Sequence, residues 1–220
     1  MRELSLLEAR VLGVLIEMAH TVPDSYPLSL NSLVSGCNQK TTRDPVMNAT
    51  EAEVQVTADA LKSLHLVFES SGSRVTRYEH NMGRVMALPS QSVALLAVLM
   101  LRGPQTSSEL RANTDRLHRF ADVSSVDGFL EELATRAEDK GGPLVVKLPR
   151  APGAREARWS HLLCGAIDVS AMPVAAQSED FVAASELAAL KSQQLAMQRE
   201  IDDLRSLVEK LYTELGVSRE

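Results

Sequence analysis

The polar run from Asn38 to Pro45 carries the side chains best suited to contact a ligand. Amide and hydroxyl groups surround two cations in this run, and such groups on a turn can hold a phosphate. The predicted contact residues are Asn38, Gln39, Lys40, Thr41, Thr42 and Arg43. The alternative is that Arg43 pairs locally with Asp44 and only fixes the shape of the turn. We call residues 38–45 the signature turn.

Cations of later segments could extend this contact surface. They lie on two predicted β-wings and ahead of a second predicted recognition helix: Arg74, Arg77, Arg111, Arg116, Arg119, Lys147, Arg150, Arg155 and Arg158. Arginines on a wing can enter the minor groove of DNA. The alternative is that these charges are only solvated. The pattern predicts contact with double-stranded DNA through the wings and turns.

Residue patterns for catalysis or metal binding do not occur in the sequence. The five histidines show no spacing typical of metal ligands, and no phosphate-binding glycine loop or Gly-x-Ser-x-Gly motif is present. Cys37 and Cys164 lie far apart and form neither a disulfide framework nor a zinc motif, so each is expected to be a small core residue. We expect no enzyme activity, no cofactor and no metal.

The charge balance favours a second hypothesis of another class. The chain has a net charge of −6, which counts against strong non-specific DNA binding. The two recognition helices begin with carboxylates, Glu51 and Glu53 in one, Glu131 and Glu132 in the other. These acidic faces would suit a basic protein partner, so the alternative is a protein–protein interaction module that binds no nucleic acid. No apolar run approaches the ~20 residues of a membrane span, and we expect a cytoplasmic protein.

Apolar periodicity predicts the elements that would position these residues. A helix follows a capping box of Ser5 and Glu8, a second helix covers about 29–37, and a third runs from a capping Thr50 to about Leu64. Two strand patterns, at 66–69 and 74–80, flank a Ser-Ser-Gly-Ser turn and predict a β-wing. Helix, polar turn, helix and wing is the order of a winged helix-turn-helix.

The second half repeats the first. Residues 11–15 match 95–99 in apolar pattern, 27–33 match 104–110, and 60–64 match 129–133. Ser124 and Asp127 are expected to cap the second recognition helix, and strands at 144–148 and 157–162 predict a second wing.

The C-terminal segment predicts a coiled coil. Apolar residues recur at alternating steps of three and four: Leu187, Leu190, Met197, Ile201, Leu204, Val208, Leu211 and Leu215. Gln194 is a polar residue within the same seam. We expect a homodimer through this helix; the alternative is a long helix that packs back on its own chain.

The predicted fold class is mainly α with small β-wings (α+β): two tandem winged helix-turn-helix domains plus a C-terminal coiled-coil helix. The predicted boundaries are 1–88 and 89–165 for the winged-helix domains, 166–180 for a linker and 181–217 for the coiled coil. The string Cys37-Asn38-Gln39-Lys40-Thr41, with Arg43-Asp44-Pro45-Val46 after it, resembles the YceH-like family of uncharacterised bacterial proteins. The resemblance implies tandem winged-helix domains and no settled biochemical function.

Overall fold

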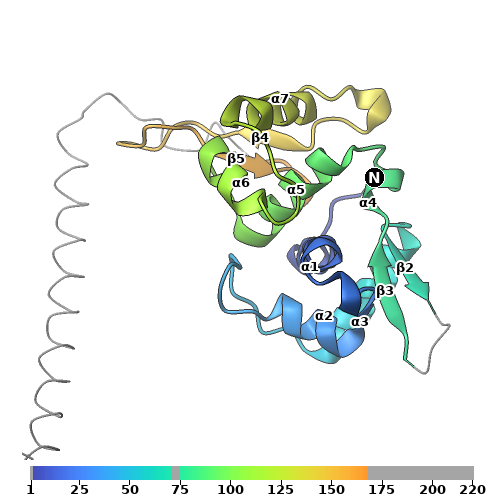
Figure 1. Ribbon diagram of the computed structural model, residues 1–220. Coiled ribbons are helices and arrows are strands. Elements are labelled where there is room, and N and C mark those ends of the chain that lie inside the picture. The colour runs from blue at the N-terminus through green and yellow to red at the C-terminus, as the bar shows by residue number, and fades with distance from the viewer. Residues whose placement is uncertain (1, 71–74, 168–220) are drawn as a thin grey trace, which may run out of the picture. The chain divides into compact units, whose positions relative to one another are not determined.

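A computed structural model describes residues 2–70 and 75–167. The chain divides into two compact units, one of residues 1–149 and 156–172, the other of residues 150–155 and 173–220. The predicted coiled coil and its eight seam residues lie outside the described residues, as does most of the predicted linker. The described part is mainly helical with two small antiparallel sheets (Figure 1).

The first half contains a three-helix arrangement with a small sheet. Its helices are α1 (Leu6–Thr21), α2 (Leu30–Cys37) and α3 (Glu51–Ser63), followed by the short α4 (Met82–Val85). A 3-10 turn, η1 (Pro23–Ser25), precedes the short strand β1 (Leu28–Ser29), and β2 (Val67–Ser70) and β3 (Arg77–His80) complete the sheet in the order β1-β3-β2. The predicted capping boxes are confirmed, with Ser5 and Glu8 at α1 and Thr50 and Glu53 at α3.

The second half repeats the order of helices and ends in a strand pair. It contains α5 (Ser90–Arg102), α6 (Ser107–Thr114), α7 (Val123–Ala134) and η2 (Glu138–Lys140), then β4 (Val145–Lys147) paired antiparallel with β5 (Trp159–His161). The predicted cap of α7 is wrong. Asp122 is the N-cap, and its carboxylate accepts a hydrogen bond from the Ser125 amide at 2.7 Å. Ser124 donates to the same carboxylate, and Asp127 instead accepts from Ser107 on α6.

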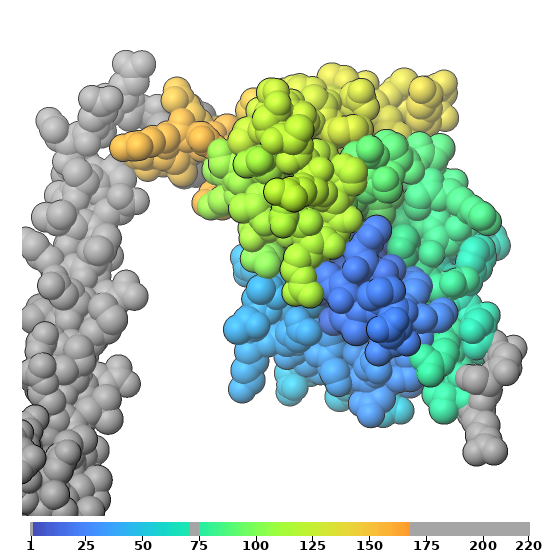
Figure 2. All heavy atoms as spheres, viewed as in Figure 1, coloured from blue at the N-terminus to red at the C-terminus, as the bar shows by residue number. Residues whose placement is uncertain are grey.

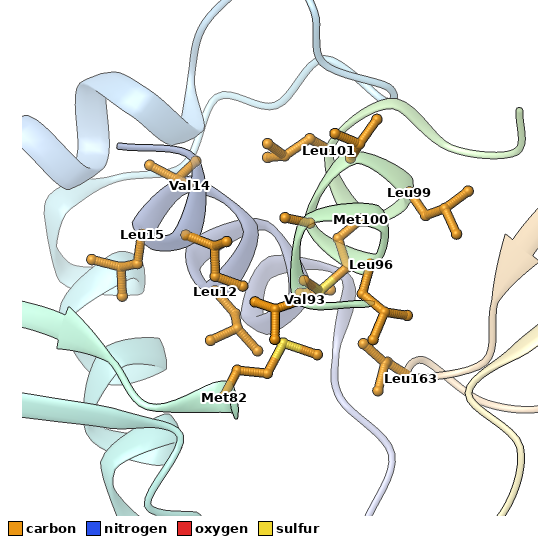
Figure 3. Close-up of a cluster of buried hydrophobic side chains, with 14 of the residues drawn as sticks. Leu12, Val14, Leu15, Met82, Val93, Leu96, Leu99, Met100, Leu101 and Leu163 are labelled. Carbon is orange, nitrogen blue, oxygen red and sulfur yellow. The ribbon is translucent and has the colours of Figure 1, made fainter. Parts of the chain in front are cut away.

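Helices α1 and α5, which carry the matching apolar segments of the repeat, pack against each other. Each is apolar on nearly all sides, and residues 11–16 and 93–101 are buried throughout. Figure 1 shows α1 between α5 and α3, and Figure 3 shows side chains from α1, α4 and α5 meeting in one cluster. A helix that is buried all round needs cover on every side, and α1 receives it from both halves of the chain.

Gly13 allows the close approach of these two helices. A Cβ atom placed there would lie 3.0 Å from Cγ of Leu101 and 3.4 Å from Cβ of Met100. The space-filling view shows the atoms of the two halves in direct contact (Figure 2). The two halves of the chain therefore share a core, although Pro89, at the predicted boundary between residues 88 and 89, is itself exposed. None of the described helices is long and apolar enough to cross a membrane.

Candidate nucleic-acid interface

The signature turn begins the loop that connects α2 to α3, and the side chain of Asn38 bonds to the far end of this loop. The Asn38 side chain donates to the Ala49 carbonyl and accepts from the Ala49 amide, each at 2.8 Å. This pair of hydrogen bonds ties the end of α2 to the residue before the N-cap of α3. The amide group of Asn38 is therefore engaged within the protein, and its position between the helices has a structural explanation.

Arg43 is buried, which contradicts its predicted place on a phosphate-binding surface. Its side chain is fully covered, and its guanidinium forms an ion pair with Glu17 of α1, whose side chain is 18% exposed. Nε donates to the Gly36 carbonyl at 3.1 Å and Nη1 donates to the Thr42 carbonyl at 3.0 Å. The alternative prediction is that Arg43 forms an ion pair that only fixes the shape of the turn. Arg43 does form an ion pair, but its partner is Glu17 and not Asp44.

A second buried arginine, Arg10 of α1, also holds the turn. Only 1% of Arg10 is exposed; its Nη1 donates to the Cys37 carbonyl at 3.1 Å and its Nη2 to the Pro45 carbonyl at 2.7 Å. Burial and then the charge of Arg43 lower the pKa of Arg10. Cys37 is a core residue as expected, and burial raises the pKa of its thiol to about 12.

Arg10 and Glu17 did not emerge as important from the sequence, although a signal was present. Arg10 lies between apolar residues in a helix that is apolar on nearly all sides. A charged residue in such a helix must be buried, and buried charges require partners. The partners of Arg10 are carbonyls at both ends of the signature turn.

Asp44 joins the turn to the second half of the chain. Its backbone amide donates to the Leu101 carbonyl, near the end of α5, at 2.8 Å. Its carboxylate lies beside Gly103, where a Cβ atom would be 3.1 Å from Oδ2. Gly103 has φ 72° and ψ −161°, a conformation that is essentially restricted to glycine. The signature turn is therefore held by contacts near both of its ends.

The exposed residues of the turn include a short polar group. Lys40, Thr41 and Thr42 are exposed and Gln39 is half-buried. Ammonium, hydroxyl and amide groups of this kind can donate hydrogen bonds to a phosphate.

Helix α3 itself presents an acidic and apolar surface. Glu51 and Asp59 are exposed, and Val56 between them is 69% exposed. Lys62 pairs with Asp59 and with Glu69 of β2.

The pair of β2 and β3, predicted from sequence to be the first wing, contributes little free positive charge in the described part of the chain. Arg77 is half-buried, and its Nη1 donates to the Pro27 carbonyl at 2.7 Å. Arg74 lies outside the described residues.

The turn between α6 and α7 exposes arginines. Arg116 is exposed, and the side chain of Arg119 is 88% exposed with its Nε 3.7 Å from Asp115. Arg111 is exposed too, and its Nη2 donates to the Ala121 carbonyl at 3.0 Å, which holds the turn. The structure therefore places two cations of the second half, Arg116 and Arg119, on one turn and a third, Arg111, on α6 beside it.

Some of the cations near the second strand pair have partners within the protein. Lys147 lies 3.9 Å from Glu131 and 5.0 Å from the ring centre of Trp159. Arg158 donates to Glu109 at 2.9 Å and to the Pro104 carbonyl at 2.8 Å. Arg150 and Arg155 are exposed and belong to the second compact unit.

Among residues 2–70 and 75–167, no group of three or more histidine, cysteine, aspartate or glutamate side chains could hold a metal ion. Two histidines in this part are strongly perturbed: burial lowers the pKa of His80 and of His161 to about 4. Both imidazoles are therefore neutral at pH 7.

Comparison with known proteins identifies relatives along nearly the whole chain. A UPF0502 protein of Leptothrix cholodnii is 62% identical over 220 residues, which cover 99% of this chain and 97% of the relative. UPF0502 proteins of Burkholderia pseudomallei and Burkholderia ambifaria are 60% and 58% identical, and the matches cover 99% of this chain and 91% of each relative. The family model described as "Protein of unknown function, DUF480" matches residues 4–155. The predicted membership of an uncharacterised bacterial family is thereby confirmed, and the chain belongs to the DUF480 family.

Proposed function

We propose that this chain is a cytoplasmic, non-enzymatic regulator with two tandem winged helix-turn-helix domains, which binds double-stranded DNA through the turn between α6 and α7. The observation that carries the proposal is the exposure of Arg116 and Arg119 on that turn, with Arg111 beside them. Cations in such a position neutralise phosphates, and phosphate neutralisation supplies most of the affinity for duplex DNA.

The order of elements supports this assignment. Each half runs from a helix through a second helix, a turn and a third helix to an antiparallel strand pair, which is the order of winged helix-turn-helix domains. In the first half, Lys40 with Thr41 and Thr42 would add one further phosphate contact. Arg43 and Asn38 take no part in it, because both are engaged within the protein.

Dimerisation through the predicted C-terminal coiled coil is part of the proposal. Two copies of a domain side by side would contact two DNA half-sites. Removal of residues 181–220 is expected to lower the mass measured by sedimentation from that of two full chains to that of one truncated chain. A mass equal to two truncated chains would remove the coiled coil from the proposal.

The DNA proposal is tested by fluorescence anisotropy with a short random-sequence duplex between about 50 and 200 mM salt. In the double variant Arg116→Ala/Arg119→Ala, affinity should fall at the lower salt concentration. The slope of log K against log salt is negative, and its magnitude should decrease by about 1.8, since each lost phosphate contact contributes about 0.9.

The matched control is Arg84→Ala/Lys140→Ala, which removes two exposed cations from α4 and η2 and changes net charge equally. It should retain the wild-type slope. If both double variants lose affinity to the same extent, net charge and not the α6–α7 turn governs binding. If the wild-type chain shows no affinity at the lowest salt, DNA binding is wrong.

A protein-interaction module is the second candidate, and the surface of α3 favours it. A helix that reads DNA faces phosphates, whereas α3 exposes Glu51, Val56 and Asp59. An exposed apolar residue with acidic neighbours suits a basic protein partner. Crosslinking of the full chain in cells, compared with its Val56→Arg variant, tests this candidate. Crosslinks that are unaffected by the substitution would exclude α3 as the contact surface.

A further inference from the structure

A pocket lies among segments of both halves of the chain, within the first compact unit. It has a volume of about 340 Å³, and its walls are the residues before α1, the end of α3, α4, η2, and the segments before β4 and after β5. The Leu4 amide donates to the Leu163 carbonyl at 2.8 Å, which joins two of these walls. Pockets that bind small molecules begin at about 300 Å³, so the volume suits a small ligand.

Two cations of the lining lack a carboxylate partner. Arg136 is half-buried and follows α7, and Lys140 is exposed and ends η2. In the described part of the chain, no carboxylate lies within ion-pair distance of either one. Nη2 of Arg136 donates to the Met86 carbonyl at 2.6 Å; Nε and Nη1 form no hydrogen bond there, but neither atom is enclosed, so a ligand can reach them. A Cβ atom at Gly141 would lie 3.3 Å from Nη1, which places the guanidinium next to the residue that follows Lys140.

The other charged residues of the lining do not neutralise these two cations. Arg2 is a third cation, and its guanidinium donates to both carboxylate oxygens of Glu8. Glu3 is exposed, and its carboxylate lies beside Gly165, outside the lining, where a Cβ atom would be 3.1 Å from Oε1 and Oε2. A ligand in the pocket would therefore meet two cations that need a counter-ion.

The rest of the lining is mainly apolar. Val85, at the end of α4, is 40% exposed, and it lies at this pocket. Ligand sites typically combine such apolar walls with a few polar groups that fix the orientation of the ligand. The walls therefore suit a ligand with an apolar group beside its charge. The apolar residues used here are Leu64, Val85, Met86, Pro143, Leu144 and Leu162.

We propose that this pocket binds a small, soluble phosphate monoester with an apolar group, whose phosphate accepts hydrogen bonds from Arg136 and Lys140. A phosphate monoester carries about two negative charges at pH 7 and three strong acceptor oxygens, which matches two cations. A guanidinium offers paired donors to such a group, and an ammonium adds a point charge. The apolar group packs against Val85 and Met86, which belong to the first half of the chain. This binding does not depend on DNA binding.

1-Naphthyl phosphate is the probe. Equilibrium dialysis with the full chain should show saturable binding of one molecule per chain, with a Kd of about 1 mM or tighter. 1-Naphthol, which lacks the charge, and 1-naphthoate, which carries a single charge, should each bind at least about fivefold more weakly. Absence of saturation by about 10 mM, or equal affinity for either compound, overturns the proposal. The chain should not sediment with vesicles that contain phosphatidic acid; cosedimentation would assign the phosphate to a lipid and overturn a soluble ligand.

Variants place the site. Lys140→Glu reverses an exposed charge of the pocket and should weaken naphthyl phosphate binding at least about tenfold. Arg116→Glu makes the same change in charge on the turn between α6 and α7, outside the lining, and should bind the probe as the wild type does. An equal loss in both variants would mean that net charge governs binding, and it overturns the proposal.

A second variant covers failure of the first to fold. Val85→Glu adds a carboxylate at an exposed position of the apolar wall and should also weaken binding at least about tenfold. It serves if Lys140→Glu fails to fold by circular dichroism. Wild-type affinity in a folded Lys140→Glu or Val85→Glu variant shows that the pocket is not the site.

Discussion

Replacement of Arg43 by methionine tests whether the signature turn is a structural device held by a buried ion pair. Loss of one partner from a buried pair costs about 3–5 kcal/mol. Water can reach Glu17, which is 18% exposed, so the lower value of about 3 kcal/mol applies. Two carbonyls, of Gly36 and Thr42, also lose a donor, which adds about 1 kcal/mol. The expected loss of about 4 kcal/mol is a large part of a typical stability of 5–15 kcal/mol.

Urea unfolding followed by circular dichroism measures this loss. Lys40→Met is the matched control, because it removes the same charge from an exposed position of the same turn, and it should change stability by less than about 0.5 kcal/mol. The double variant Arg43→Met/Glu17→Leu should lose less than the sum of the two single variants, by about 1–3 kcal/mol. A loss below about 1 kcal/mol for Arg43→Met, or additivity in the cycle, would refute the structural role.

Three further predictions concern stability. The pKa of His161 is lowered to about 4 in the folded chain from 6.5 in the unfolded chain, so the unfolded chain binds more protons between these two pH values. The free energy of unfolding should therefore fall by up to about 3 kcal/mol as pH drops from 6.5 to 4. Urea titrations at several pH values should show that His161→Gln lacks this part of the pH dependence. Gly13→Ala should destabilise the protein by about 1–3 kcal/mol, because the added methyl group crowds Leu101. Gly128→Ala, in open space on α7, should stabilise the protein by about 0.5–1 kcal/mol. Equal effects of the two substitutions would contradict the close packing of α1 against α5. Asp122→Ala should lower the Tm, because it removes the N-cap of α7. A comparable decrease in Tm for Ser124→Ala would instead support Ser124 as the cap, as predicted from the sequence.

The local elements followed from the sequence because short-range patterns determine them. Serine or threonine with glutamate three residues later marked the starts of α1 and α3, and both capping boxes are present. The cap predicted for α7, Ser124 with Asp127, is wrong because Asp122, two residues before Ser124, can also cap a helix, and backbone geometry decides between them. Asp122 has the extended conformation that a cap requires.

The candidate site was less predictable because burial is a tertiary property. Lys40 and Arg43 carry the same charge in the same polar run of the sequence, yet Lys40 is exposed and the side chain of Arg43 is fully buried. The difference arises from Glu17, 26 residues earlier, which no spacing rule connects to the turn. The pocket beside Arg136 was equally hidden, since its walls come from segments between Arg2 and Leu163.

The packing of α1 against α5 also has a consequence for synthesis on the ribosome. The apolar surface of α1 is complete once Thr21 has emerged, but its cover on one side comes from α5, which ends at Arg102, about 80 residues later. At about 5–20 residues per second, this interval lasts roughly 4–16 s. During that time the nascent first half exposes an apolar helix, which is the kind of surface that chaperones bind. Translation speed between the two helices should therefore influence the yield of folded protein.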